Sequence, residues 1–500
     1  MSHIPVPPPN TAAEVDERCR TAGRAAPALA ALPPADRAAL LDRLADTLRS
    51  HEQEIVTLAD TETSLGRARL TGELHRTAGQ LELFAGALRD GGVLDVIIDA
   101  PDPAAQPAPR PGLRRWLVPI GPVAVFSASN FPLAFSVLGG DTASALAAGC
   151  PVVVKAHSGH PRLSDLVAGL ATEVLPSGVL AVVHGREAGI RLVGHPDIAA
   201  VGFTGSVAGG RALFDLAAAR PDPIPFYGEL GSVNPVVVTP AASAARAGEL
   251  ISGFVNSFTL GNGQFCTKPG LLFLPRGHGW EDRLATAVAA VPAAPMLGPW
   301  ICAGFAEARD RLAATAGVRL LAGDTKPRSG DDPTLTGPAL FATSAADFAG
   351  NPAMADEAFG PAALVVEYAS EQELKRVLAT LPGSLTATLH ADAAAEKALA
   401  CRLLTLLSGK AGRVVWGGWP TGVAVAWATQ HGGPWPAATP STHTGVGVTA
   451  MRRFQRPVSF QGLPDELLPE ALRDANPWHL ARRVDGVPAR PEPATAAGPR

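Results

Sequence analysis

Hydrophobic and polar positions change their spacing along the chain, and each change predicts a different structural unit. In residues 1–92 apolar residues recur every three or four positions, as in AALLDRLADTLRSHEQEIVTLA, which predicts amphipathic helices. Two apolar runs follow in residues 93–119, VLDVIIDA and LRRWLVP, joined by the Pro-rich stretch PDPAAQPAPRPG. Two such runs on either side of a connector are typical of a long-looped β-hairpin.

Short apolar runs alternate with helical patterns from Val123 onwards. The predicted strands are VAVFSAS, PVVVKAH, VLAVVHG and IAAVGFTGS. The predicted helices between and after them are AFSVLGGDTASALAAG, SDLVAGLATEVLPSG, REAGIRLVGHPD and VAGGRALFDLAAAR. This alternation predicts βαβ units and a buried parallel sheet, hence a doubly wound α/β domain that binds its ligand at the carboxyl ends of the strands.

A second α/β block is predicted for residues 232–435. Its strand candidates are NPVVVTP, GLLFLP, PAALVVEYA, SLTATLH and GRVVWGG, and RPVSFQ is expected to form a last edge strand. The Pro- and Ala-rich tail, residues 487–500, is predicted to be disordered. The length of 500 residues also indicates two to four structural units, because single cores rarely grow beyond about 250–300 residues.

The composition narrows the class of protein. A content of 47% hydrophobic and 18% charged residues fits a globular chain better than a disordered one. The net charge of -4 gives no basic excess, so we expect neither a nucleic-acid partner nor an anionic membrane partner. The sequence has no signal-peptide pattern and no uninterrupted membrane-spanning stretch. Five scattered cysteines without a CxxC pair favour a reducing cytoplasm over a disulfide framework.

Three segments carry side chains suited to a nucleophilic reaction. GNGQFCTKPG places Cys266 at a predicted turn, although an arbitrary cysteine is more often a small buried hydrophobe. FYGELGSVNP places Glu229 after a predicted strand, where it is either a general base or a solvated loop residue. SASNFPLAF places Asn130 after another strand, where its amide either donates to an oxyanion or caps a turn.

Two further segments are candidates for a dinucleotide site. In GFTGSVAGG, Gly205 and Ser206 lie at a predicted strand-to-helix junction, where backbone N–H groups can hold a phosphate. The spacing is not GxGxxG, so this segment alone is equally compatible with an ordinary loop. Lys155 ends PVVVK at the carboxyl edge of the predicted sheet, where it either contacts a ribose or phosphate or is simply solvated.

Together these segments resemble the aldehyde dehydrogenase superfamily over nearly the whole chain. SNFP, VVVKAH, GFTGS, ELGSVNP, GQFCTKPG and DEAFGP follow one another in the order typical of that superfamily. KAHSGHP, ATQHGGPWPAAT and RPVSFQGLPDELLPEALRDANP are similar to the branch of α-ketoglutaric semialdehyde (2,5-dioxovalerate) dehydrogenases and NADP-dependent fatty aldehyde dehydrogenases. The resemblance implies an NAD(P)+-dependent oxidoreductase that converts an aldehyde to a carboxylate, with 2,5-dioxovalerate giving 2-oxoglutarate.

The resemblance implies a role for each catalytic candidate. Cys266 would be the nucleophile that forms a thiohemiacetal with the aldehyde. Asn130 and the backbone N–H of Cys266 would form the oxyanion hole. Hydride transfer to the nicotinamide would give a thioester, and Glu229 would activate the water that hydrolyses it. No metal is expected in this reaction.

The resemblance also assigns the residues around the cofactor. Lys155 would contact the adenosine ribose or its 2′-phosphate. Gly205 and Ser206 would lie at the helix that binds the pyrophosphate. Glu357 and Phe359, in DEAFGP, would hold the nicotinamide ribose and ring.

The choice between NADP+ and NAD+ depends on the loop after Lys155. In NAD-preferring relatives an acidic residue often lies three positions after this lysine, where this chain has Ser158. Without that carboxylate a 2′-phosphate is not repelled, and His157 or Ser158 can donate a hydrogen bond to it. We therefore expect NADP+ to be accepted and preferred, with NAD+ also usable.

The implied fold is α/β and aldehyde dehydrogenase-like. A Rossmann-type cofactor domain would comprise residues 1–92 and 120–231, and residues 232–435 would form an α/β catalytic domain. Residues 93–119 and 454–461 would form a β-arm for oligomerisation. Because unpaired edge strands are a liability, we expect the arm to extend the sheet of a second copy in a homodimer or homotetramer.

The substrate class stays open at this point. A semialdehyde that yields a dicarboxylate needs a cation for its distal carboxylate, for which Arg413 and Arg456 are candidates. An apolar pocket without a cation would favour broad oxidation of medium- or long-chain aliphatic aldehydes. A non-catalytic scaffold is disfavoured by the presence of Cys266, Glu229 and Asn130. A reductase of acyl phosphates or acyl-CoA is disfavoured because a water-activating glutamate would cause hydrolysis.

Overall fold

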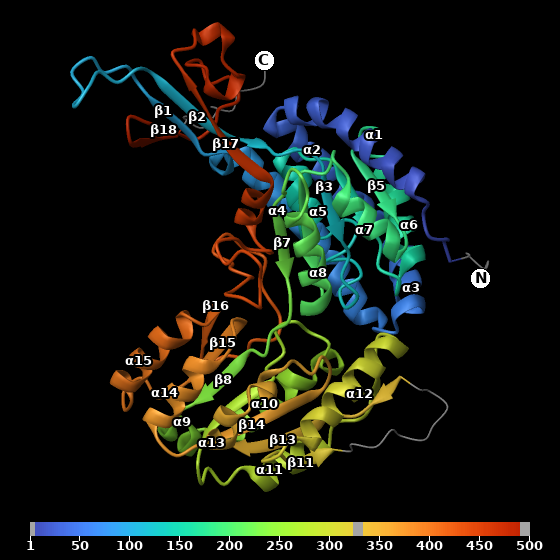
Figure 1. The fold of residues 1–500 in the computed structure, drawn as a ribbon, viewed down its shortest axis with the longest axis vertical. Coiled ribbons are helices and arrows are strands. Elements are labelled where there is room, and N and C mark those ends of the chain that lie inside the picture. Colours follow the sequence, from blue (N-terminus) through green and yellow to red (C-terminus); the bar gives the residue numbers. More distant parts are fainter. Residues whose placement is uncertain (1–5, 324–333, 491–500) are drawn as a thin grey trace, which may run out of the picture.

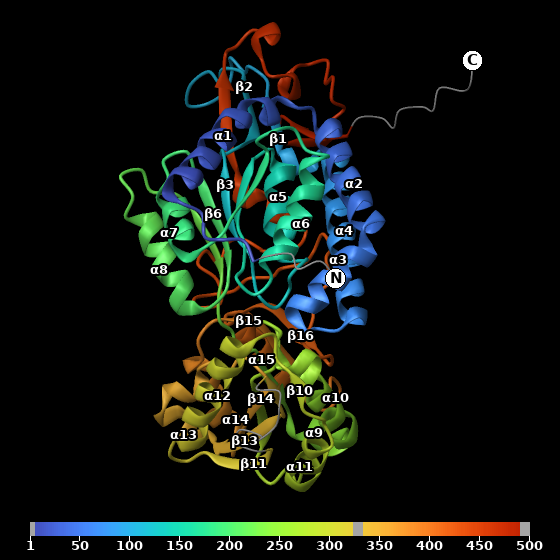
Figure 2. The same cartoon turned by 90° about the vertical axis from the view of Figure 1, so that its right-hand side faces the viewer.

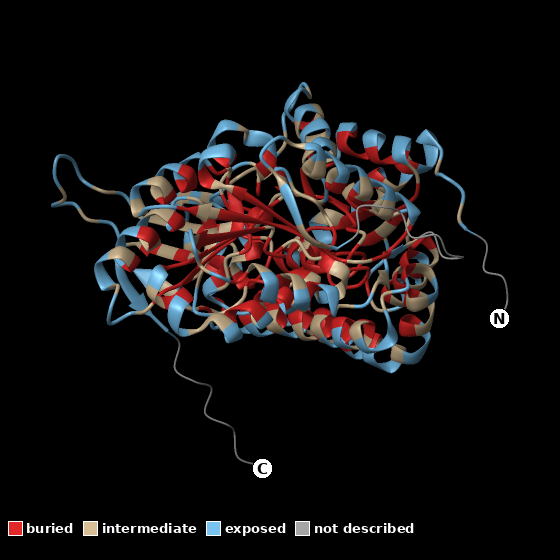
Figure 3. Ribbon diagram, turned by 90° about the horizontal axis from the view of Figure 1, so that it is seen from below, coloured by how far each residue is buried: buried red, intermediate tan, exposed pale blue. Residues whose placement is uncertain are grey.

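The computed structural model describes residues 6–323 and 334–490, and in this part of the chain the strands form three large sheets. Figure 1 shows two lobes stacked along the long axis, with the third sheet projecting from the upper lobe, and Figure 2 gives the perpendicular view. The strands at the centre of each lobe are buried and the outer faces of the helices are exposed (Figure 3). None of the described helices has the length and apolar character needed to cross a membrane.

The upper lobe contains a parallel sheet with the strand order β5-β4-β3-β6-β7. Its strands are β3 (Val123–Phe126), β4 (Val152–Lys155), β5 (Leu180–Val183), β6 (Ala200–Thr204) and β7 (Phe226–Glu229). The helices that alternate with them are α5 (Gly140–Ala148), α6 (Pro161–Thr172), α7 (Arg186–Gly194) and α8 (Val207–Ala218). The order reverses at β3, so the predicted doubly wound fold is confirmed, with its ligand edge at the carboxyl ends of the strands.

Four N-terminal helices complete this lobe, as the apolar spacing predicts. They are α1 (Ala12–Ala31), α2 (Pro34–Ser50), α3 (Glu52–Thr63) and α4 (Arg67–Asp90). Apolar side chains of α2, α3 and α4 share one buried core with those of α5, α6 and strands β3 and β4. Burial of this apolar surface is the main force that holds α4 beside the sheet, at roughly 25 cal/mol per Å² removed from water.

The helix predicted from Ala134 begins later, at Gly140. The segment before it forms turns, and the Glu73 carboxylate of α4 accepts hydrogen bonds from the backbone N–H groups of Leu133 (2.8 Å) and Ala134 (2.9 Å). A side chain distant in the sequence therefore satisfies N–H groups that a helix would otherwise pair. No local pattern carries that information.

The lower lobe is built on a seven-stranded sheet with the order β11-β13-β14-β9-β8-β15-β16, parallel except for β11. The strands are β8 (Pro235–Val238), β9 (Leu271–Pro275), β11 (Arg319–Gly323), β13 (Ala339–Ser344), β14 (Ala362–Tyr368), β15 (Ser384–His390) and β16 (Ala411–Trp416). Two short strands, β10 (Ala294–Pro295) and β12 (Leu335–Thr336), pair beside it. Five of the seven strands match the sequence prediction, whereas β11 and β13 have no distinct pattern.

Helices cover both faces of this sheet. They are α9 (Pro240–Ala245), α10 (Ala247–Thr259), α11 (Glu281–Ala289), α12 (Pro299–Ala314), α13 (Ala345–Gly350), α14 (Glu371–Thr380) and α15 (Lys397–Ser408). The helices α13, α14 and α15 pack with one face of the strands, and α10 and α11 with the other. Side chains of both faces are buried, as expected for a largely parallel sheet.

The third sheet has the order β17-β2-β1-β18-β19 and forms the projecting arm. Its strands are β1 (Val96–Asp99), β2 (Leu113–Pro119), β17 (Gln455–Gln461), β18 (Arg482–Val484) and β19 (Val487–Ala489). The predicted hairpin is confirmed as the antiparallel pair β1 and β2, and the predicted edge strand RPVSFQ lies within β17.

The prediction of disorder from Val487 is wrong for the first residues of that tail, because they form β19. Asp485 and Gly486 have φ angles of 43° and 81° and connect β18 to β19. An Asp-Gly pair with positive φ at both positions is a strong hairpin signal, and Pro488 is tolerated because β19 is an edge strand. Residues 491–500 lie outside the described part of the chain.

An ion pair fastens the segment before β17 to the upper lobe. Arg453 Nη1 lies 2.7 Å from Asp141 Oδ1 of α5, and Nη2 donates to the Ser144 hydroxyl at 3.1 Å. Only 4% and 12% of the two charged side chains are exposed. Breaking such a buried pair by removing one partner typically costs about 3–5 kcal/mol, so this contact keeps the C-terminal segment in place.

Candidate active site

The register of the upper sheet brings the candidate residues to one edge. Phe126 of β3 pairs with Lys155 of β4 and with Phe203 of β6, and Thr204 pairs with Glu229 of β7. The strands are parallel, so Lys155 and Glu229 both lie at the carboxyl edge. Asn130, Gly205 and Ser206 follow the ends of β3 and β6 at the same edge.

The turn that carries Cys266 depends on glycine and on a buried asparagine. Gly263 has a φ of 66°, and a Cβ there would lie 2.3 Å from the backbone of Gly360, so only glycine fits. The Asn234 amide donates to the carbonyls of Cys266 (2.8 Å) and Lys268 (2.9 Å). These two hydrogen bonds fix the backbone on both sides of the thiol.

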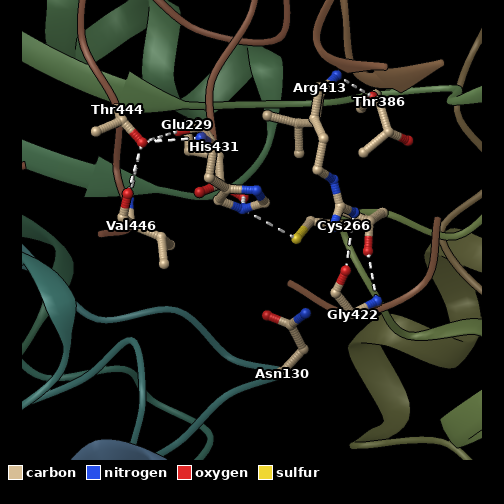
Figure 4. A network of polar contacts seen from close by, with 12 residues as sticks. Asn130, Glu229, Cys266, Thr386, Arg413, Gly422, His431, Thr444 and Val446 are labelled. Atoms are coloured by element: carbon tan, nitrogen blue, oxygen red, sulfur yellow. Dashed lines mark hydrogen bonds and ion pairs between the residues drawn. The ribbon is translucent and has the colours of Figure 1, made fainter. Parts of the chain in front are cut away.

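Three side chains from distant segments meet at the thiol. The Cys266 Sγ lies 3.6 Å from His431 Nε2, and the same nitrogen lies 2.9 Å from Glu229 Oε1. Figure 4 shows the Cys266 sulfur directed toward the His431 ring. The His431 backbone N–H donates to the Thr444 hydroxyl (2.8 Å), and Glu229 forms a β-bridge with Ala438. The sulfur, nitrogen and oxygen atoms also lie within 4.8 Å of one another, a spacing that a metal ion can bridge.

His431 is the residue that the sequence analysis missed. It lies in ATQHGGPWPAAT, a Gly- and Pro-rich loop with no helix or strand pattern, 202 positions after Glu229. Its ring is fully buried, and Nδ1 has no hydrogen-bond partner among the described residues. Because the pKa of Glu229 is lowered and its carboxylate is ionised, His431 Nε2 carries a proton and donates it to Glu229 Oε1, so the histidine orients this carboxylate.

Burial and charge set the protonation of the thiol and the carboxylate. Burial alone would raise the pKa of Glu229, but the charge and hydrogen bond of His431 and a hydrogen bond from the Cys266 thiol outweigh it, so this pKa lies below its usual value. Burial raises the pKa of the Cys266 thiol well above its ordinary value, and the Glu229 carboxylate raises it further. The site therefore holds an ionised carboxylate and a protonated thiol, which needs a proton acceptor before it can react.

Figure 4 shows the Asn130 side chain pointing toward Cys266 from below. One N–H of its side-chain amide donates to the Gln264 carbonyl at 3.1 Å. The amide nitrogen carries a second N–H, which is available to an oxygen atom bound near Cys266. The backbone carbonyl of Asn130 accepts a hydrogen bond of 2.6 Å from Arg69 Nη2, which fixes this turn against α4.

The N-terminus of α8 has the features of a phosphate site. Ser206 is the N-cap, and its hydroxyl accepts a hydrogen bond from Gly209 N–H at 3.2 Å. Gly205 and Ser206 are exposed, and a Cβ at Gly205 would lie 2.8 Å from the Phe203 ring. First-turn N–H groups have no intrahelical acceptor, so they face outward toward an anion.

The loop after β4 presents a neutral histidine. Burial, together with the charges of His160 and Lys155, lowers the pKa of His157 to about 3. The Gly159 N–H donates to His157 Nδ1 at 3.0 Å, so the proton of the neutral ring lies on Nε2 and can be donated. Burial also lowers the pKa of Lys155. Ser158 is exposed beside them.

Glu357 belongs to the lower lobe, and its carboxylate contacts the backbone shortly after Glu229. Its Oε2 accepts a hydrogen bond from the Ser232 N–H at 3.3 Å, close to Gly231. Burial raises the pKa of Glu357 and lowers that of Lys268, whose ammonium donates to the carbonyls of Ala358 (2.9 Å) and Ala362 (2.7 Å). Phe359 is partly buried two positions after Glu357.

The two cations considered for a substrate carboxylate lie in different environments. Arg413 Nη2 donates to the carbonyls of Pro420 (2.5 Å) and Gly422 (2.8 Å), so it holds a loop next to Cys266, and its Nε is buried without a partner among the described residues. Arg456 is exposed on β17 of the arm. Because both of these hydrogen bonds of Arg413 use Nη2, its Nε and Nη2 edge is not free to hold a carboxylate through two parallel N–H groups.

A family model described as "Aldehyde dehydrogenase family" matches residues 4–433. The chain belongs to the aldehyde dehydrogenase family. It is 48% identical over 484 residues to alpha-ketoglutaric semialdehyde dehydrogenase 2 of Azospirillum brasilense, covering 95% of this chain and 91% of that protein. It is 43% identical over 488 residues to alpha-ketoglutaric semialdehyde dehydrogenase of Acinetobacter baylyi, with the same two coverages.

Solved aldehyde dehydrogenases have the same fold. Lactaldehyde dehydrogenase from Escherichia coli gives a TM-score of 0.78 at 22% identity, covering 91% of this chain and 92% of that one. Aldehyde dehydrogenase 21 from Physcomitrella patens, in complex with the product succinate, gives 0.76 at 21% identity, with the same two coverages. Aldehyde dehydrogenases use NAD(P)+, and the carboxyl edge described above provides the helix N-terminus and polar side chains that such a dinucleotide needs.

The raised pKa of Cys266 predicts how this aldehyde dehydrogenase reacts with iodoacetamide. Alkylation of Cys266 should be slow near pH 7 and should still accelerate above pH 9, because only the thiolate reacts. Glu229→Gln removes a charge that raises this pKa, so its profile should shift to lower pH. Peptide mass spectrometry measures the alkylation of Cys266 in both proteins. Alkylation of the exposed Cys401 in the same samples shows that the reagent is active. A wild-type rate that is already maximal near pH 6 would contradict the account.

Proposed function

We propose that the chain oxidises 2,5-dioxovalerate to 2-oxoglutarate, with NADP+ as the preferred hydride acceptor and Cys266 as the nucleophile. The observation that carries the chemistry is the buried contact of Cys266, His431 and Glu229 beside Asn130. The substrate is supported by the two relatives named alpha-ketoglutaric semialdehyde dehydrogenase, each aligned over 95% of this chain.

The first step needs a thiolate, and Glu229 is placed to generate it. The carboxylate accepts a hydrogen bond from the Cys266 thiol and takes its proton, while the Nε2–H of His431 donates to Oε1 at 2.9 Å and holds the carboxylate in place. The sulfur attacks the aldehyde carbon and forms a thiohemiacetal on Cys266. The oxyanion accepts hydrogen bonds from the second N–H of Asn130 and from the Cys266 backbone, a type of contact that contributes about 3–4 kcal/mol.

The second step converts the thiohemiacetal to a thioester. When bound, the nicotinamide cofactor accepts the hydride from the former aldehyde carbon. Glu357 and Phe359 are the residues we assign to the nicotinamide end, with Gly205 and Ser206 at the pyrophosphate. These assignments use the exposed N-terminus of α8 and the position of Glu357 against Ser232 N–H.

Hydrolysis of the thioester needs a water molecule and a base. A cavity of about 20 Å³ is lined in part by Glu229, His431, Phe135 and Gly445, and this volume is sufficient for one water. Glu229 Oε2 is buried and has no hydrogen-bond partner among the described residues, so it can take the proton of that water. Glu229 has by then released the thiol proton to solvent, so it is free to act again. As the thioester breaks, the proton that Glu229 takes from water passes to the leaving Cys266 sulfur, and the carboxylic acid leaves.

The proposed preference for NADP+ rests on Lys155, His157 and Ser158. The Lys155 ammonium supplies positive charge, and the Nε2–H of the neutral His157 ring supplies a donor. Ser158 adds a small hydroxyl without negative charge. A 2′-phosphate therefore meets donors and no repelling carboxylate in this loop.

A second candidate substrate class is favoured by an apolar cluster near the thiol. Phe131, Phe135 and Val446 are buried together, and Phe265, Val423 and Val425 pack against them. Such a lining would accept a medium- or long-chain aliphatic aldehyde. The two classes differ in whether a negative charge at the far end of the substrate is required.

We also propose that the arm associates with a second copy of the chain. β17 and β19 are the edges of the arm sheet, and Val487 on β19 is exposed. An exposed edge with apolar side chains is suited to strand addition from another subunit. Light scattering after size-exclusion chromatography measures the molar mass of the protein in solution. The mass of a single chain at all protein concentrations would refute this assembly.

A panel of aldehydes tests the proposed reaction. We expect 2,5-dioxovalerate to give the highest kcat/KM, ahead of glutarate semialdehyde, hexanal and benzaldehyde, measured by formation of reduced cofactor. Cys266→Ser should lower turnover by at least about 10³-fold while cofactor binding stays unchanged. Cys401→Ser, at an exposed position on α15, is the matched control. Fastest turnover of hexanal would move the substrate to the aliphatic class, and no turnover of any aldehyde would refute the proposal.

A charge introduced at position 158 tests the cofactor assignment. Ser158→Glu should lower kcat/KM for NADP+ by about 10²-fold, because the carboxylate repels the 2′-phosphate, and should spare NAD+. Ser177→Glu adds the same charge at an exposed position before β5, at the opposite edge of the sheet, and should leave the ratio unchanged. An unaltered NADP+/NAD+ ratio in Ser158→Glu would place the 2′-phosphate elsewhere.

A further inference from the structure

One face of α4 carries charged residues toward the turn that contains Asn130. Arg69, Glu73 and Arg76 are spaced by four and three positions, so their side chains share one side of the helix. Glu73 Oε1 accepts the N–H groups of Leu133 and Ala134. This face therefore supports the catalytic turn, and it holds two cations for one carboxylate.

The guanidinium groups of Arg69 and Arg76 make different contacts. Arg69 Nη2 donates to the Asn130 carbonyl, and its guanidinium lies 4.9 Å from the centre of the Phe265 ring. Arg76 Nε and Nη2 are buried and have no hydrogen-bond partner, and within the described residues Arg76 forms no ion pair. Its guanidinium lies 5.6 Å and 5.5 Å from the ring centres of Phe131 and Phe135.

The two unpartnered nitrogen atoms define what Arg76 is able to bind. The Nε–H and one Nη2–H lie parallel on the same edge of the planar guanidinium, and a carboxylate accepts both at once. A buried guanidinium with unsatisfied donors is costly unless an anion completes it. Burial also lowers the pKa of Arg76, a direction that a bound anion opposes.

The charge of Arg76 acts on the reaction centre. Its positive charge lowers the pKa of Cys266, and the charges of Cys266 and Glu229 act on the pKa of Arg76 in return. The ring of Phe135, over which Arg76 lies, is 6.3 Å from the His431 ring. Phe131 and Phe135, which Arg76 contacts, belong to one buried apolar cluster, and Phe265, the residue before Cys266, packs against it. A short methylene chain that joins Arg76 to the thiol would pack on these rings.

We propose that Arg76 is the subsite for a carboxylate at the far end of the aldehyde substrate. The ligand class is a short aldehyde with a terminal carboxylate or 2-oxo-carboxylate, held by the Nε and Nη2 edge while its aldehyde carbon meets Cys266. The phenylalanine rings pack on the methylene groups between the two ends. This inference rests on the proposed function and names the residue that makes the semialdehyde a better substrate than its neutral analogue.

Kinetics of Arg76→Met with a charged and a neutral aldehyde test the subsite. For 2,5-dioxovalerate we expect kcat/KM to fall by about 10²-fold, mainly through KM, because two charge-assisted hydrogen bonds are lost. For hexanal the change should stay within about 3-fold. Arg89→Met, on the exposed side of the same helix, should leave both substrates unchanged. Arg69→Met should weaken both equally, because Arg69 positions Asn130.

Equal losses on both aldehydes in Arg76→Met would overturn the subsite and make Arg76 a structural residue. Arg76→Lys keeps the charge without the parallel N–H pair, and a partial recovery for 2,5-dioxovalerate alone supports the proposal even if the methionine variant folds poorly. Calorimetric binding of 2-oxoglutarate to Cys266→Ser separates this inference from the proposed function, because it needs no turnover. If Arg76→Met, added to Cys266→Ser, abolishes the binding of 2-oxoglutarate, the subsite is supported. If 2-oxoglutarate binds equally well with and without this substitution, the subsite is overturned.

Discussion

The site depends on the buried contact in which one imidazole nitrogen of His431 touches both the Cys266 sulfur and the Glu229 carboxylate. Each group comes from a different part of the fold: Glu229 from the end of β7, Cys266 from the turn before β9, and His431 from the loop after β16. Bringing an ionised carboxylate and a histidine out of water is costly, so the surrounding structure has to hold them rigidly. Asn234 and Thr444 supply that rigidity through hydrogen bonds to Cys266 and His431.

The same burial shapes the reactivity of the thiol. It raises the pKa of Cys266, so the resting site carries a thiol and not a permanent thiolate. Attack is then coupled to proton acceptance by Glu229, which His431 holds in place, and the same carboxylate acts again in the later hydrolysis. The positive charge of Arg76 acts on the thiol in the opposite direction to burial, which connects substrate binding to the electrostatics of the nucleophile.

Much of the fold follows from local patterns, because a buried parallel strand is a short apolar run between turn residues. The upper sheet, five strands of the lower sheet and the arm hairpin were predictable in this way, as were the positions of Lys155 and Glu229 at strand ends. Local patterns do not indicate the late start of α5 or the strands β11 and β13. The Asp485–Gly486 turn does have a hairpin pattern, but the Pro- and Ala-rich composition after it points to disorder instead. His431 and Arg76 were missed because their environment consists of residues distant in the sequence, and neither segment has a chemical pattern of its own.

The most direct test of the account is to trap the acyl group on the nucleophile. Glu229→Gln protein would be mixed with 2,5-dioxovalerate and NADP+ at alkaline pH, where solvent can remove the thiol proton in place of Glu229, then quenched in acid within one turnover and analysed by peptide mass spectrometry. The account predicts an acyl adduct on Cys266 that accumulates to nearly one per subunit, because the neutral amide introduced by this substitution cannot take the proton of the hydrolytic water. A release of carboxylate at the wild-type rate, or an adduct on another cysteine, would contradict it.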